Sequence, residues 1–99
     1  MSFVIAQPEL LAAAASHLHG IGTAMNEQNA AAAGPTTSVV PAAGDQVSAL
    51  TATQFVAHAA LYQAVCAQAA EVHDLFVRTL GASAGSYATT EAANAIATR

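Results

Sequence analysis

The chain contains no lysine and no tryptophan, and its 99 residues include only two basic side chains and one cysteine. Two cations cannot form the clustered phosphate contacts that nucleic acids require, so nucleic-acid binding is excluded. The single cysteine, Cys66, excludes a small domain held together by disulfides. Charged residues make up only 8% and hydrophobic residues 55%, which is too apolar for a disordered chain. What remains is one small domain with an unusually apolar surface.

The chain has no lysine or arginine before Arg78. The N-terminus therefore lacks the basic region of a cleaved secretion signal. The longest uncharged run, residues 46–70, is long enough to cross a bilayer. Glutamines interrupt it, however, and alanine gains little in lipid. We expect no transmembrane helix, and any export must follow a route without a cleaved N-terminal signal.

A first helix is predicted over about 8–33. Pro8 suits the first turn, where its missing N–H costs nothing, and Gly34–Pro35 is a strong stop signal after Ala33. Gly20 and Gly22 each lower helix stability by about 1 kcal/mol, and inside a helix they indicate close approach of another helix. Apolar residues recur at three- and four-residue steps between these limits: Leu11, Ala14, Leu18, Ile21, Met25 and Ala32.

A connector over 34–44 leads to a second predicted helix over about 45–80. Asp45 is a candidate N-cap, and Gly81 offers a C-cap after Leu80. The remaining residues, 81–99, form a tail.

The second helix carries two apolar stripes. One comprises Phe55, His58, Tyr62, Val65, Ala69, Val72 and Phe76, and the other comprises Leu50, Ala57, Leu61, Ala64 and Leu75. A hairpin folding back on the first helix can cover one stripe. The other then faces water, and an apolar surface of that size marks an interface.

The predicted fold is all-α, an elongated antiparallel two-helix hairpin. Two helices cannot enclose a core, whereas four can, so either a second copy or a different helical partner completes a bundle. The 28 alanines favour this, because small side chains let helices approach closely. The predicted interface residues are Leu11, Leu18, Ile21, Met25, Leu50, Phe55, His58, Leu61, Tyr62, Val65, Val72 and Phe76.

Catalysis has one candidate, Ser83, within a G-x-S-x-G pattern over 81–85. That motif acts on a strand-to-helix turn and needs an acid and then a histidine later in the chain. Glu91 could be the acid, but no strand precedes the motif and the last histidine, His73, lies upstream. We expect no catalytic activity and no cofactor.

Metal binding is also not expected. His17 and His19 point to nearly opposite sides of a helix, and His58 and His73 lie about 22 Å apart along one. Cys66 has no C-x-x-C companion. We interpret Cys66 as a small buried hydrophobe and His58 as a hydrogen-bonded interface residue.

Tyr87 and Glu91 in the tail share one helix face, at i and i+4. Ser86 could cap a short terminal helix there. Composition alone predicts a frayed tail without a role.

The sequence resembles the PE family, mycobacterial proteins named for a Pro-Glu pair, here Pro8-Glu9. The resemblance covers essentially the whole chain and is similar to short members that lack a C-terminal extension. Its other matching segments are Met1–Val4, Asn29–Thr37, Val40–Ala43, Val47–Thr51 and Ser86–Ala88.

The resemblance implies a partner and a destination. PE proteins pair with PPE proteins as a four-helix bundle, and such pairs are exported by type VII (ESX) secretion systems. The family's export motif, Y-x-x-x-D/E, matches Tyr87 and Glu91. A W-x-G turn in the partner is thought to complete the signal, and a cytosolic chaperone is expected to contact mainly the PPE subunit before the ESX secretion ATPase and machinery act.

We therefore expect a non-enzymatic subunit, made in the cytoplasm and exported to the cell envelope or surface or secreted. It would stabilise a PPE partner and carry the export signal. Two alternatives stay open. One is a homodimeric secreted helical hairpin, against which the missing Trp and the Pro-containing connector argue. The other is a small esterase that uses Ser83.

Overall fold

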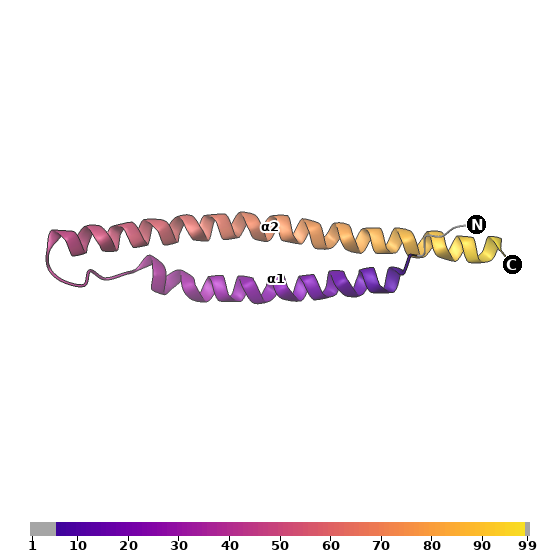
Figure 1. The fold of residues 1–99 in the computed structure, drawn as a ribbon, viewed down its shortest axis with the longest axis horizontal. Coiled ribbons are helices and arrows are strands. Elements are labelled where there is room, and N and C mark those ends of the chain that lie inside the picture. The colour runs from indigo at the N-terminus through magenta and orange to yellow at the C-terminus, as the bar shows by residue number, and fades with distance from the viewer. Residues whose placement is uncertain (1–5, 99) are drawn as a thin grey trace. The chain divides into compact units, whose positions relative to one another are not determined.

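The computed structural model describes residues 6–98, which form two α-helices and no β-strand (Figure 1). Helix α1 spans Pro8–Thr37 and helix α2 spans Gln46–Ala97. Residues 38–45 connect them. The all-α prediction is confirmed. Within the described range, neither helix has both the length and the hydropathy of a membrane span.

Helix α1 begins as its sequence indicates. Pro8 is its first residue, and Glu9 places a carboxylate in the first turn, where the partial positive charge of the helix end favours it. The backbone amides of Leu10 and Leu11 donate to the Gln7 carbonyl, which closes the first turn.

The predicted end of α1 at Ala33 is wrong, because the helix continues through Pro35 to Thr37. Proline removes one backbone donor, and in the last turn that loss is small since few hydrogen bonds remain to be made. Side-chain hydroxyl groups add hydrogen bonds to this last turn. Thr36 Oγ1 donates to the Ala32 carbonyl at 2.6 Å, and Thr37 Oγ1 donates to the Ala33 carbonyl at the same distance.

Helix α2 begins after an N-cap formed by Asp45, as predicted. The Ser48 amide donates to Asp45 Oδ2 at 3.1 Å, and the Ser48 hydroxyl donates to Oδ1 at 2.6 Å. These two hydrogen bonds hold the pKa of the Asp45 carboxyl below its ordinary value of 3.8.

Removing this cap should fray the first turn of α2. A group with a lowered pKa stabilises the fold above its ordinary pKa, and that stabilisation disappears as the pH falls through the lowered value. The cap should therefore hold at neutral pH and fail below pH 3.8. In Asp45→Ala, the amides of Val47 and Ser48 should exchange with solvent faster at neutral pH. Asp45→Asn keeps an acceptor and should remove the pH dependence; unchanged exchange in Asp45→Ala would contradict the cap's role.

Helix α2 also continues well beyond its predicted end at Leu80. Gly81 is not a C-cap, and Ser86 caps no separate helix, because residues 81–97 belong to α2 itself. A glycine C-cap requires a positive φ, and no glycine in the described range has one. Glycine inside a helix costs only about 1 kcal/mol, and the alanines around Gly81 favour helix. The tail prediction for 81–99 is therefore wrong up to Ala97.

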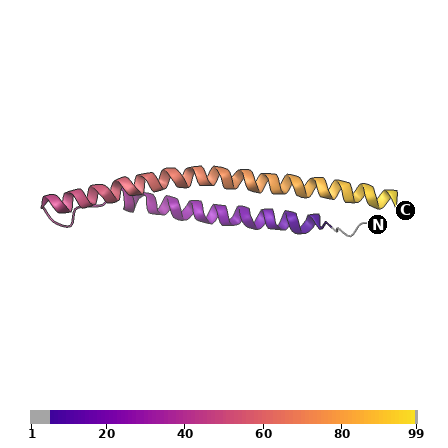
Figure 2. The same ribbon diagram turned by 45° about the horizontal axis from the view of Figure 1, so that its top comes forward.

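The described residues divide into two compact units, each pairing a stretch of α1 with a stretch of α2. The terminal unit contains the chain up to Gly22 and from His73 onward, and the connector unit contains Thr23–Val72. In each unit the two helices lie side by side (Figures 1 and 2). The connector reverses the chain in its unit, so that the two helices there run antiparallel, as the predicted hairpin requires.

Alanine forms the core of both units. The buried residues in the described range are Ala15 and Ala84 in the terminal unit, and Ala52 and Ala59 in the connector unit. No large side chain in the described range is fully buried. A buried methyl group contributes only about 0.8 kcal/mol, so apolar burial stabilises each unit weakly.

Polar side chains add contacts between the helices of the connector unit. Tyr62 donates its hydroxyl hydrogen to Asn29 Oδ1 at 3.2 Å, and Gln63 Nε2 donates to the Asn29 carbonyl at 3.0 Å. Both bonds reach one residue of α1, which aligns the two helices at that level.

In the terminal unit a histidine fits over a glycine. His73 Nε2 lies 2.6 Å from the Leu18 carbonyl oxygen, and because a carbonyl only accepts, the ring nitrogen donates. A Cβ placed on Gly22 would lie 2.6 Å from this ring, whereas one on Gly20 would meet nothing within 4 Å. Close approach of another helix was predicted for both glycines, and it is confirmed for Gly22 and wrong for Gly20.

This difference predicts unequal effects for two similar substitutions. Gly20→Ala should stabilise α1 by about 1 kcal/mol through helix propensity. Gly22→Ala gains the same propensity but displaces the His73 ring and its hydrogen bond, so it should fall about 1–2 kcal/mol short of Gly20→Ala. The measurement is the temperature at which half the helical circular-dichroism signal is lost. In a His73→Ala background the two substitutions should become equivalent; a difference that persists there would contradict this account.

Candidate protein interface

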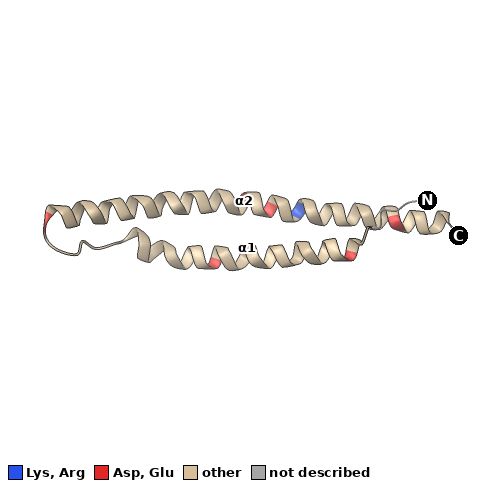
Figure 3. Cartoon of the chain, in the orientation of Figure 1, with Lys and Arg blue, Asp and Glu red and all other residues tan. Residues whose placement is uncertain are grey.

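The large apolar side chains lie on the surface. Among residues 6–98, sixteen of them are exposed: Leu10, Ile21, Met25, Val39, Val40, Val47, Leu50, Phe55, Leu61, Tyr62, Val65, Val72, Leu75, Phe76, Tyr87 and Ile96. Charged side chains, which would keep such a surface soluble, are sparse along both helices (Figure 3). Apolar surfaces of this extent mark sites of protein association.

The solvent-accessible area of the chain shows how large this exposed surface is. The chain exposes 7484 Å², whereas a folded monomer of 9.9 kDa typically exposes about 5,200 Å². The excess is about 2,300 Å², and a stable interface covers about 800 Å² on each partner. The surface is therefore more than sufficient for one complete protein interface.

Neither predicted stripe of α2 is covered, so the expectation that the hairpin buries one of them is wrong. Phe55, Tyr62 and Phe76 of the first stripe and Leu50 and Leu61 of the second are all exposed.

A third row of α2, with alternating four- and three-residue steps, is buried or half-buried instead. It comprises Ala52, Val56, Ala59, Gln63, Cys66 and Ala70 in the connector unit, and His73, Val77, Leu80 and Ala84 in the terminal unit. Small side chains at a contact allow two helices to pack at the short end of the usual interaxial range. Bulky rows would hold the helices apart, so the alanine-rich row packs and the bulky rows stay outside.

The predicted interface residues of α1 divide into two groups. Ile21 and Met25 are exposed, whereas Leu11 and Leu18 are half-buried within the terminal unit. Cys66, which was predicted to be buried, is half-buried. His58 is exposed, and the described part of the chain supplies no hydrogen bond to its ring.

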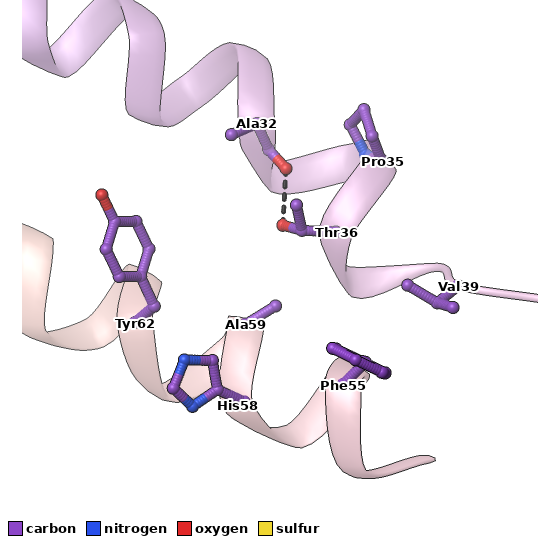
Figure 4. A pocket seen from close by; sticks show the side chains of 8 residues that line it. All are labelled: Ala32, Pro35, Thr36, Val39, Phe55, His58, Ala59 and Tyr62. Carbon is purple, nitrogen blue, oxygen red and sulfur yellow. Dashed lines mark hydrogen bonds between the residues drawn. The ribbon is translucent and has the colours of Figure 1, made fainter. Parts of the chain in front are cut away.

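The two sides of the connector unit differ in chemistry. One side has an apolar hollow of about 290 Å³, which we call the tip pocket; it is lined by Ala32, Pro35, Thr36, Val39, Phe55, His58, Ala59 and Tyr62 (Figure 4). The other side has a smaller hollow of about 190 Å³, lined by Asn26, Asn29, Ala30, Gln63, Cys66, Ala67 and Ala70. Aromatic rings line only the first hollow, whereas amides and small side chains line the second.

Internal hydrogen bonds occupy most polar groups of the tip pocket. Thr36 directs its hydroxyl to the Ala32 carbonyl (Figure 4), and Tyr62 directs its own to Asn29. The adjacent Cys66 thiol raises the pKa of the Tyr62 phenol above its ordinary value of 10.0, so the ring is uncharged at neutral pH. The Thr36 and Tyr62 hydroxyls are thereby engaged, which leaves a largely apolar lining.

The predicted export residues lie on α2 in the terminal unit. Both are exposed, and half of the Tyr87 surface is accessible. Their i, i+4 spacing on a continuous helix places them on one face, as predicted. Next to Tyr87 is a hollow of about 480 Å³ whose walls carry the hydroxyl groups of Thr79, Ser83, Ser86 and Thr90.

The structure removes the context that the Ser83 motif needs for catalysis. Residues 81–85 lie inside α2, and residues 6–98 contain no strand that could form a strand-to-helix turn. His73, the nearest upstream histidine, is engaged with the Leu18 carbonyl.

Metal ligands are likewise not gathered. Among residues 6–98, no three His, Cys, Asp or Glu side chains are close enough together to hold an ion. His17 and His19 remain on the exposed surface of α1.

Comparison with known sequences identifies the family. Residues 4–94 match the model of the PE family. The chain belongs to the PE family. Pro8 and Glu9, the pair on which the resemblance was first based, lie within the matched residues at the first turn of α1. The matching stretch Met1–Val4 lies outside the described residues.

Its relatives in Mycobacterium tuberculosis (strain ATCC 25618 / H37Rv) differ in length. PE family protein PE13 is 64% identical over 97 residues, which cover 98% of both chains. PE family protein PE8 is 56% identical over 97 residues, 98% of this chain but 35% of PE8. A protein named Esterase PE16 is 56% identical over 95 residues, which form 96% of this chain but 18% of that protein.

Two features of this surface were not predicted from the sequence. The row that packs α2 contains polar and small residues, so a search for apolar periodicity passes over it. The tip pocket is lined by residues of α1, the connector and α2. No short sequence pattern predicts a pocket whose residues come from three separate segments. Pro35 and Phe55 were each identified separately, as a stop signal and as a stripe residue.

Proposed function

We propose that this PE protein is a non-enzymatic subunit of a PE–PPE heterodimer exported by a type VII secretion system. The observation that carries the proposal is that, in the described part of the chain, sixteen large apolar side chains are exposed while the buried core is four alanines. Two helices of a PPE partner would cover the first stripe of α2 together with the exposed residues of α1. The result is a four-helix bundle.

The second part of the proposal concerns export. Tyr87 and Glu91 form the export signal, and their exposure on one face of α2 makes them accessible to a secretion machine. The chain is made in the cytoplasm, and a chaperone contacts mainly the PPE subunit before the secretion ATPase engages the pair. The destination is the cell envelope, the surface or the medium.

Esterase activity is not part of the proposal. The esterase relative extends far beyond the matched residues, which form 18% of its length. Ser83 lies on a continuous helix. Any ester hydrolysis by the purified chain should persist in Ser83→Ala.

Co-expression tests the heterodimer. The chain is produced with a panel of PPE-family proteins, and one of them should co-purify as a 1:1 complex with a sharper thermal transition than either chain alone. Light scattering of the chain by itself is the control. A stable homodimer that binds no PPE protein would support the homodimeric alternative and overturn the proposal.

A further inference from the structure

The tip pocket has the form of an anchor site for one side chain. Its walls are Phe55 and Tyr62 on α2 and Pro35 on α1, and its depth comes from Ala32 and Ala59, whose methyl groups leave the space unfilled (Figure 4). Ala59 is buried, so the floor is rigidly set by the helix contact itself. Interface residues that dominate affinity are typically large side chains inserted into such pockets.

We infer that the tip pocket takes one large apolar side chain from a helix of the partner subunit, and that this insertion selects which partner is accepted. The inference rests on the proposed heterodimer and names the contact that gives it specificity. Its occupant is a bulky aliphatic or aromatic residue. His58, at the rim with both ring nitrogens available, hydrogen-bonds a polar group next to that residue.

The chemistry of the lining favours a side chain over a free small molecule. The lining offers few polar groups to orient a ligand, because the Thr36 and Tyr62 hydroxyls are already engaged. Shape, apolar contact and the His58 ring at the rim are what remain for recognition.

Exposure shows that the pocket is incomplete in the isolated chain. Phe55 is 61% exposed and Tyr62 is 49% exposed. The excess area of the chain, about 2,300 Å², exceeds the roughly 800 Å² per partner that a stable complex needs. A partner helix lying along the first stripe of α2 covers both rings and the pocket between them.

The opposite side of the connector unit is a poor site for the same occupant. Its hollow is lined by Asn26, Asn29 and Gln63, and an apolar side chain there would separate amide groups from water without replacing their hydrogen bonds. The partner helix is therefore directed to the tip-pocket side.

Charge favours a different chain over a second copy. The net charge is −4 and the chain has no lysine. Two copies brought together would repel each other, whereas a neutral or basic partner would not.

The test fills or empties the pocket in the co-expressed complex. Thr36→Phe adds a ring at an exposed wall, and Thr53→Phe is its matched control, because position 53 lies about 200° around the helix from Phe55. Phe55→Ala removes a wall, and Leu75→Ala, at an exposed leucine of the second stripe, is its control. The probe is the PPE-family protein that co-purifies with the unchanged chain, and the readout is its dissociation constant.

Thr36→Phe and Phe55→Ala should each weaken binding at least about tenfold, and the two controls should stay within about threefold. Truncating one large apolar residue of the partner to Ala should restore binding to Thr36→Phe alone, which identifies the occupant. If the complex forms but both pocket variants bind like their controls, the pocket inference is overturned while the heterodimer stands. If no PPE-family protein binds and Phe55→Ala instead dissociates a homodimer, the occupant is a second copy and both proposals fail.

Discussion

Replacing Tyr87 with alanine should reduce export to background while leaving the heterodimer intact. Half of the Tyr87 surface is accessible, and no hydrogen bond within the described residues involves its hydroxyl. Alanine is the strongest helix former, so α2 should remain helical through this position. The substitution removes an aromatic surface next to the Glu91 carboxylate and little else. The expected effect is loss of recognition without loss of folding.

Three variants separate recognition from stability. Tyr87→Phe keeps the ring and should retain export if the aromatic face is what is recognised. Glu91→Gln keeps the shape, removes the charge and should reduce export. Ile96→Ala, a similar truncation of an exposed residue on the same helix, should be exported normally. The measurement compares the protein in the culture filtrate with that in the cells, together with co-purification of the partner. Normal secretion of Tyr87→Ala would refute the signal assignment.

Produced without a partner, the chain should be helical but poorly folded, and it should aggregate. Each unit buries two alanines, whereas ordering a residue costs about 1–2 kcal/mol of backbone entropy. Alanine-rich segments keep helical character through local propensity alone. Circular dichroism should therefore show helix, while thermal unfolding should be broad and a hydrophobic dye should bind.

Adding the partner should reverse the broad unfolding, the dye binding and the aggregation. Covering the apolar surface should sharpen the thermal transition, abolish dye binding and make the complex monodisperse in light scattering. Polar substitutions at Phe55, Val72 and Phe76, applied together, should solubilise the isolated chain and abolish the complex. A monodisperse monomer with a sharp transition would contradict the interface argument, because such a chain would be complete by itself.

Local features of the sequence predicted the helix starts well. Pro8 at the first turn and the Asp45 cap depend on neighbours within four residues, and both are in place. The helix ends were predicted poorly for a related reason. Pro35 and Gly81 are stop signals only on average. Near Pro35 the threonine hydroxyls add hydrogen bonds to the carbonyls of the preceding turn, and around Gly81 the alanines maintain the helix.

The exposed apolar surface was predicted in part. Periodicity grouped Phe55 and Leu61 into two apolar stripes, and both residues are on the surface although one stripe was expected to pack against α1. It could not find the packing row, because Gln63, Cys66 and His73 do not form an apolar pattern. The tip pocket could not be predicted from the sequence either. Pro35 and Phe55 are twenty positions apart and line one pocket only because the chain reverses.

The scarcity of charge and the abundance of alanine were readable from the sequence alone, as were the helical class and the family resemblance. Those properties depend on composition and on contacts within a few residues. Only the tertiary structure decided which face of α2 packs against α1. The face that packs is the alanine-rich row, which allows the closest approach of the two helices. That choice is made between helices, where the size of the facing side chains matters more than their hydrophobicity. It is why the bulky apolar side chains remain outside, available to a partner.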